Sequence, residues 1–238
     1  MSKRKAVFFD LDGTLTRMNL NDMFKDFYKE MEIHGVLQIF HKDFDTAVKI
    51  YNDAYFYSLE HVGTKSNADV FFEELQRKYG IKRSVIEPAM DNFFENDFHN
   101  TGRLCEPHTL QREIIDTLKQ KGYRLILATF PCFPESASQI RLKWAGLDLS
   151  DFEYNTHYYN CKYYKPSKEY YDDILKNTNL QPGECIMVGN DVKQDMCTAD
   201  WGFEVFLLTG YQIGENTQNY REGNLAQLLK YARELPRV

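Results

Sequence analysis

The chain has 238 residues, of which 43% are hydrophobic and 27% are charged. These values are ordinary for a globular protein and exclude the disordered, collagen-like and disulfide-scaffold classes, and a chain of this size buries about three quarters of its surface on folding. The net charge of −6 gives no bulk attraction to nucleic acid or to an anionic membrane, so a phosphate-bearing ligand needs a local binding site.

The sequence shows no targeting, membrane-spanning or zinc-binding pattern. No run approaches the roughly 18–20 apolar residues that cross a bilayer, and the apolar run 6–9 is too short for a signal peptide. The cysteines are odd in number and widely separated, which predicts reduced thiols in a cytoplasmic protein and argues against a zinc site. A reactive role for Cys132, near a motif described below, is the less favoured alternative. The five cysteines are Cys105, Cys132, Cys161, Cys185 and Cys197.

The first predicted element is a strand over residues 6–9, and a long helical segment follows it. Residues 18–105 contain no convincing strand but show four apolar stripes with helical spacing. We expect Ser66 or Asn67 to cap the third helix. These features predict an all-helical cap domain over 18–105, inserted into a core domain of residues 1–17 and 106–238. The stripes are Leu20, Met23, Phe24, Phe27, Tyr28 and Met31; Phe40, Phe44, Ala47, Val48 and Tyr51; Val70, Phe71 and Leu75; and Ile86, Met90, Phe93 and Phe94.

After the insertion, strands and helices alternate. The predicted strands are 124–128, 185–188 and 205–208, and they show little alternation of polar and apolar residues, as expected when helices cover both faces of a parallel sheet. Helical stripes lie at residues 110–118, 140–144, 170–175 and 225–232. The predicted fold class is α/β, a doubly wound parallel sheet with an inserted helical domain.

The strongest functional motif lies at the end of the first strand. Asp10 and Asp12 are two residues apart, so in an extended chain both side chains project to the same side. Gly13 permits a sharp turn, and Thr14 can satisfy backbone donors there. A calcium loop would need a glutamate at the twelfth position, where Asn21 stands. Ligands of open α/β sheets bind at this end of the strands.

A second acidic cluster follows the strand 185–188. Asp191 and Asp195 are four residues apart and face one way if a helix begins there. Adjacent strand ends would bring them beside Asp10 and Asp12. Carboxylates crowded in this way repel one another or shift their pKa values upward unless a cation neutralises them, and oxygen-only ligands suit Mg²⁺.

Two further residues complete the charge balance. Thr129 directly follows the strand 124–128, so its hydroxyl and the next backbone N–H groups would project into the same crevice and bind anionic oxygens. Lys165 precedes a proline at the start of a helix and would supply a point charge for a phosphate or for a nucleophile. Each residue alone is more often structural, and the chain order Asp, Thr, Lys, Asp is what gives them weight.

With these four segments in order, the sequence resembles the haloacid dehalogenase (HAD) superfamily over its whole core. The resemblance implies a sheet of five parallel strands, one of them near residues 152–155. It also implies that the helical insertion is a type 1 cap, as in the small-molecule phosphatases of the family. The matching segments are Asp10-Leu11-Asp12-Gly13-Thr14, Thr129, Lys165-Pro166, and Asp191 to Asp195.

The resemblance implies a reaction through an aspartyl-phosphate. Asp10 would attack phosphorus as the nucleophile, and Asp12 would protonate the leaving alkoxide and then deprotonate water. Thr129 and Lys165 would hold the transferring oxygens. The expected function is a Mg²⁺-dependent phosphatase acting on a small phosphorylated metabolite.

Asp12 favours a phosphatase because a dehalogenase needs a nucleophile but no acid for a departing alkoxide. A phosphomutase, which shares the same residues, and a binding or regulatory protein that keeps the fold without turnover remain as alternatives. The cap disfavours protein and nucleic-acid phosphates as substrates.

The family likeness also implies that Mg²⁺ is bound by the Asp10 carboxylate, the Asp12 backbone carbonyl and Asp191, with Asp195 a ligand or an acceptor for a metal-bound water. The sequence departs from the family at two places. Asn190 stands where the family usually has the aspartate of Gly-Asp, so Asn190 and Asp191 compete for the metal. Phe130 follows Thr129, where a small or polar residue is common.

Arg17 and the loop 130–133 lie where they would touch a substrate, although a structural role is favoured for each.

Overall fold

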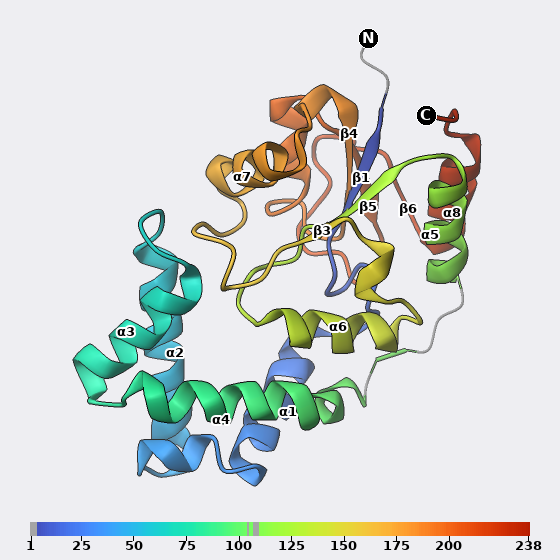
Figure 1. Cartoon of the computed structure of the whole chain (residues 1–238). Helices are drawn as coiled ribbons and strands as arrows, with labels where there is room; N and C mark the ends of the chain where they lie inside the picture. The colour runs from blue at the N-terminus through green and yellow to red at the C-terminus, as the bar shows by residue number, and fades with distance from the viewer. Residues whose placement is uncertain (1–3, 104, 107–109) are drawn as a thin grey trace.

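The computed structural model describes residues 4–103, 105–106 and 110–238 (Figure 1). Its centre is a parallel sheet of six strands in the order β3-β2-β1-β4-β5-β6. The four strands predicted from the sequence pattern are confirmed to within one residue at each end. The strands are β1 (Ala6–Phe9), β2 (Arg124–Leu127), β3 (Tyr154–Asn155), β4 (Cys185–Gly189), β5 (Glu204–Leu208) and β6 (Glu222–Gly223).

The two outer strands are too short to be predicted from the sequence pattern. β3 confirms the strand that the family resemblance implied near residues 152–155. The expectation of five strands is wrong, because β6 adds a sixth at the opposite edge. β6 contains only Glu222 and Gly223, neither a good β-former, and backbone pairing with Leu207 and Leu208 alone defines it.

Helices cover both faces of the sheet, which confirms the doubly wound α/β core. Val7 and Phe9 of β1 pack with α5 (Leu110–Gln120) and α8 (Leu225–Glu234). Ala6 and Phe8 point to the opposite face and pack with α7 (Lys168–Thr178). Alternate residues of a strand point to opposite faces, so these four residues are all buried although their sequence shows no polar alternation.

The segment between β1 and α5 is helical, as predicted. It contains α1 (Leu20–Ile33), α2 (Phe44–Glu60), α3 (Asn67–Tyr79) and α4 (Arg83–Asn96), and Figure 1 shows this group below the sheet, beside α6 (Glu135–Trp144). Its aromatic cluster extends into the core segment, since the Phe27 ring lies 5.2 Å from that of Phe133. The boundaries 1–17, 18–105 and 106–238 stay a prediction, and residues 1–3, 104 and 107–109 within those ranges lie outside the described residues.

Capping decides how the helical group is divided. Ser66 caps α3 by accepting a hydrogen bond from the Asp69 backbone N–H, which confirms one of the two predicted caps. The stripe that joined Phe40 to Phe44 is wrong, because Phe40 ends a short 3₁₀ helix and α2 begins only at Phe44. Asp43 fixes that start by accepting from the Thr46 backbone N–H at 3.0 Å. Nowhere in the described ranges is a helix both long and apolar enough to span a membrane.

Candidate active site

The chain turns sharply after β1 and places Asp10 and Asp12 at the carboxyl end of a central strand. Gly13 makes this turn with φ +83°, as predicted, and a Cβ there would lie 2.3 Å from Asn190 Nδ2, so only glycine fits. The expected role of Thr14 is corrected. Its hydroxyl does not satisfy backbone donors but lies 3.0 Å from Asp10 Oδ2 and 3.1 Å from Asn190 Oδ1.

Lys165 joins the two predicted acidic segments. Its ammonium group donates to Asp10 Oδ1 at 2.8 Å and to Asp195 Oδ1 at 2.7 Å, and its side chain is only 1% exposed. Burial by itself lowers the pKa of Lys165, but the carboxylates of Asp10 and Asp195 outweigh it and hold that pKa well above its ordinary value. Burial raises the pKa of Asp195 against the pull of Lys165. Lys165 is therefore a buried cation shared by two carboxylates.

The loop after β4 arranges its carboxylates through a turn. No helix begins at Asp191, so the condition under which Asp191 and Asp195 would share a helix face is not met. Asp191 Oδ1 accepts from the backbone N–H groups of Lys193 and Gln194 at 2.8 and 2.9 Å, and a 3₁₀ helix begins only at Met196. Asp195 Oδ2 accepts from the Asp191 backbone N–H at 3.1 Å. Short side-chain-to-backbone bonds of this kind compete successfully with a helix.

The structure distinguishes Asn190 from Asp191 as metal-ligand candidates. Both ends of the Asn190 amide are used, since Oδ1 lies beside the Thr14 hydroxyl and Nδ2 donates to the Tyr211 carbonyl at 2.6 Å. Asp191 Oδ2 accepts no hydrogen bond from the described part of the chain. Asn190 therefore connects two loops through its side-chain amide, whereas Asp191 Oδ2 is available to bind a metal ion.

Thr129 lies just beyond β2, next to the end of β1. Its hydroxyl is buried and has no hydrogen-bond partner among the described residues. Its carbonyl accepts from Tyr170 Oη at 2.7 Å and from Thr156 Oγ1 at 2.8 Å, which fixes the turn. A buried hydroxyl is costly when unpaired, so it is a candidate group for a ligand oxygen.

The site contains one charged residue that the sequence analysis missed. Arg141 of α6 forms an ion pair with Asp12, and the Arg141 side chain is 1% exposed. Its guanidinium also donates to the Ala137 carbonyl and lies over the Phe133 ring. Burial raises the pKa of Asp12, and the Arg141 charge opposes that rise. The only sequence indication was a charged residue between two apolar ones in the helix.

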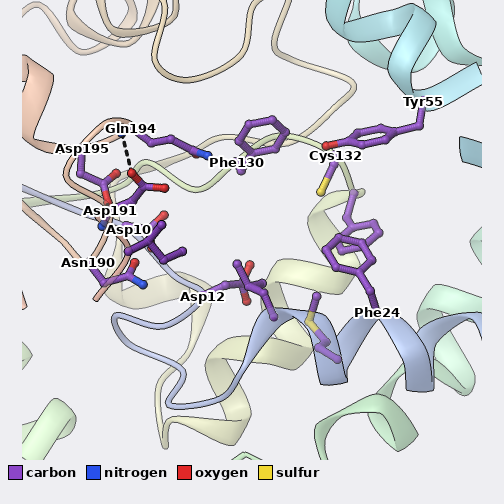
Figure 2. A pocket seen from close by; sticks show the side chains of 14 residues that line it. Asp10, Asp12, Phe24, Tyr55, Phe130, Cys132, Asn190, Asp191, Gln194 and Asp195 are labelled. Carbon is purple, nitrogen blue, oxygen red and sulfur yellow. Dashed lines mark hydrogen bonds between the residues drawn. The ribbon is translucent and has the colours of Figure 1, made fainter. Parts of the chain in front are cut away.

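These groups surround a cavity of about 200 Å³ (Figure 2). Asp10, Asp191 and Asp195 lie at one end, Tyr55 and Phe24 lie at the other, and Asp12 lies between them. The loop 130–133 contributes three residues to the lining of the cavity. They are Phe130, Cys132 and Phe133.

The structure disfavours a substrate contact for Arg17 and a reactive thiol for Cys132. Arg17 lies 3.6 Å from Glu106 and over the Tyr211 ring, and it is not part of the cavity lining. Burial raises the pKa of the Cys132 thiol to about 12, which disfavours a reactive thiolate.

The donor set suits a divalent cation in charge and in chemistry. Four carboxyl groups share the site with two buried cations, Lys165 and Arg141, so full ionisation of the carboxyl groups would leave two negative charges in excess. All four acidic groups offer oxygen, the donor that Mg²⁺ prefers. Within residues 4–103, 105–106 and 110–238, however, no three acidic, histidine or cysteine side chains form a ready-made metal cluster. A metal would therefore need backbone and substrate oxygens as well as side chains.

Replacing Lys165 by methionine is expected to destabilise the fold. The change leaves Asp10 and Asp195 buried together without a cation, and breaking a buried ion pair costs about 3–5 kcal/mol. Urea unfolding at neutral pH measures the loss. Lys168→Met is the control, because its ammonium pairs with the exposed Asp172 and such a pair contributes at most about 1 kcal/mol. Equal losses in the two variants would contradict the expectation.

Comparisons with known proteins agree with this geometry. A sequence model described as a haloacid dehalogenase-like hydrolase matches residues 4–199. No curated protein matches the chain.

Solved structures match over nearly the full length. A HAD phosphatase from Thermococcus onnurineus has a TM-score of 0.60 at 19% identity, covering 98% of this chain and 100% of its own. A predicted phosphoglycolate phosphatase from Haemophilus somnus has a TM-score of 0.56 at 18% identity, covering 97% and 99%. A β-phosphoglucomutase from Clostridium difficile has a TM-score of 0.54 at 18% identity, covering 97% and 96%. At such identities the similarity concerns the fold.

Proposed function

This chain belongs to the haloacid dehalogenase-like hydrolases, and from that premise we propose that it is a Mg²⁺-dependent phosphatase of a small phosphorylated metabolite. The observation that carries the proposal is the second carboxylate. Asp12 lines the same cavity as Asp10, and its pKa is raised by burial. A hydrolase that breaks a phosphate ester needs a proton for the departing alkoxide, whereas a dehalogenase does not.

Asp10 would begin the reaction as the nucleophile. One carboxylate oxygen of Asp10 attacks phosphorus in line, the P–O bond to the alcohol breaks, and an aspartyl-phosphate forms. Protonated Asp12 gives its proton to the leaving oxygen. Ionised Asp12, held by Arg141, then takes a proton from water, which attacks phosphorus and releases phosphate from Asp10.

The remaining groups would hold charge and position. Lys165 offsets the charge of Asp10 through its 2.8 Å contact, and the unpartnered Thr129 hydroxyl is available to a phosphoryl oxygen. Mg²⁺ would be held by the Asp10 carboxylate, the Asp12 carbonyl and Asp191. When bound, Mg²⁺ supplies the positive charge that neutralises the surplus negative charge of the carboxylates. Asp195, with both oxygens already bonded, would support Lys165 and the Asp191 loop.

The protein should release phosphate from a simple aryl phosphate in Mg²⁺ and stop when the metal is removed. Chelation leaves the carboxylates mutually repelling and the incoming ester without a counter-charge, so we expect activity to fall to background and to return with added Mg²⁺. A circular dichroism spectrum in chelator serves as the control for folding. An undiminished rate in chelator would contradict the metal requirement.

The same assay separates the alternatives. A phosphoenzyme that outlives hydrolysis and passes its phosphoryl group to an added sugar phosphate would identify a mutase. Metal binding without turnover across many phosphate esters would identify a binding or regulatory protein.

A further inference from the structure

The cavity has two chemically different halves. In Figure 2 Asp10, Asp191 and Asp195 lie together on one side, and Tyr55, Cys132 and Phe24 lie on the other, with Asp12 and Phe130 between them. The second side, here called the apolar half, combines α1, the first helix of the inserted group, with the loop after β2. The apolar half consists of Leu20, Met23, Phe24, Phe130 and Phe133. Since phosphoryl chemistry belongs to the carboxylates, the apolar half faces the rest of the ester.

No cationic side chain among the described residues lines this cavity. Two cations beside the carboxylates are already paired, Lys165 with Asp10 and Asp195, and Arg141 with Asp12. Lys193 is exposed and lines the adjoining pocket, outside the lining of this cavity. A carboxylate or a second phosphate on the leaving group would lie against the apolar half, where the cavity lining contains no cationic side chain. Burying an unpaired charge is very costly. The cavity therefore disfavours esters with a second anionic group.

The polar atoms near the apolar half are few and uncharged. Figure 2 shows the Tyr55 hydroxyl and the Gln194 side-chain amide directed toward Phe130. Neither group makes a hydrogen bond with another described residue. They suit one neutral hydroxyl or carbonyl on a ligand, but a polyol would leave most of its hydroxyls against apolar side chains.

The size of the cavity suits a compact leaving group. Its volume is about 200 Å³, and an apolar cavity of about 150 Å³ holds benzene. With the phosphoryl group in the acidic half, the remaining space accepts a body of about one aromatic ring.

We propose that the substrate is the phosphate monoester of a compact, uncharged, largely apolar alcohol or phenol, bound with its body in the apolar half. The inference rests on the proposed phosphatase function and narrows its substrate class. It excludes as preferred substrates the esters of hydroxy acids, bisphosphates and sugars.

The test compares esters whose leaving alcohols are similar in acidity. Benzyl phosphate, 4-carboxybenzyl phosphate and glycerol phosphate are assayed with Mg²⁺, and kcat/KM is measured for each. We expect benzyl phosphate to exceed both others by at least about tenfold. Binding of benzylphosphonate and of its 4-carboxy analogue, neither of which can be hydrolysed at phosphorus, gives a readout independent of turnover.

Two variants identify the apolar half as the cause. Phe24→Ala should lower kcat/KM for benzyl phosphate by about tenfold while changing that for glycerol phosphate much less. Leu20→Lys places an ammonium group beside the cavity. This variant should reduce or reverse the ratio of kcat/KM for benzyl phosphate to kcat/KM for 4-carboxybenzyl phosphate. Ile33→Lys on the same helix is the matched control, since Ile33 is 70% exposed and not part of the cavity lining.

The outcomes separate the substrate class from the reaction. Turnover of 4-carboxybenzyl or glycerol phosphate that equals turnover of benzyl phosphate overturns the substrate class and leaves the phosphatase intact. If benzylphosphonate binds more tightly than its carboxylated analogue but no ester is hydrolysed, the apolar half is supported and the phosphatase fails. Equal binding of the two phosphonates overturns the inference whatever the activity.

Discussion

Replacing Asp10 by asparagine is expected to remove phosphate release almost completely, by about 10⁴-fold or more in kcat. The carboxamide keeps the shape of the side chain but is a poor nucleophile, so the aspartyl-phosphate cannot form. Lys165 keeps its 2.7 Å contact to Asp195, which helps to hold the site together. Phosphate release from an aryl phosphate in Mg²⁺ measures the effect.

An exposed aspartate provides the matched control for this variant. Asp22→Asn changes a carboxylate at the start of α1 that pairs only with the exposed Lys25, and it should leave the rate unchanged. Unfolding curves for both variants test whether a loss of activity is caused by unfolding. Equal activity of Asp10→Asn and the wild-type protein would remove Asp10 as the nucleophile.

Replacing Arg141 by methionine is expected to destabilise the fold strongly. The guanidinium is buried and the Asp12 side chain is 12% exposed, and removing Arg141 leaves the Asp12 charge uncompensated at a cost of about 3–5 kcal/mol. Urea unfolding at neutral pH measures this loss. Arg233→Met is the control, because its ion pair with Glu113 is exposed and contributes at most about 1 kcal/mol.

The loss in Arg141→Met should depend on pH in a defined direction. The pKa of Asp12 in the folded protein lies above its ordinary value of 3.8, so folded Asp12 binds its proton more tightly than unfolded Asp12 does. Stability therefore falls as pH rises from that ordinary value through the raised pKa. Removing Arg141 raises the pKa further, so the deficit relative to wild type is largest at neutral pH and shrinks on acidification. A deficit that does not vary with pH would contradict this linkage.

The pH dependence of activity distinguishes a positioning role of Arg141 from a merely structural one. Protonated Asp12 is the proposed proton donor, so kcat/KM falls as pH rises through its pKa. Arg141 opposes the rise of that pKa, and in Arg141→Met the alkaline limb of kcat/KM should move to higher pH. An unmoved limb in a folded variant would show that Arg141 does not act on Asp12.

The sequence by itself determined the fold class and indicated the candidate site residues. Central strands that are buried on both faces need near-continuous apolar runs. The sequence therefore predicted the four central strands, which are β1, β2, β4 and β5. The carboxyl ends of parallel strands meet at one edge, so Asp10, Asp12 and the Asp191–Asp195 segment were expected together. The structure brings all of them to one cavity.

Only the tertiary structure decided how those residues are paired. The Asp12–Arg141 contact joins residues 129 positions apart, and no local pattern encodes a contact at that separation. The edge strand β6 likewise depends on backbone pairing with β5, and backbone bonds join Asn190 and Val192 to Ile213. Periodicity reports which face of an element is buried but not against what it packs. The sequence pattern therefore could not predict the apolar half of the cavity, in which α1 lies beside the loop after β2.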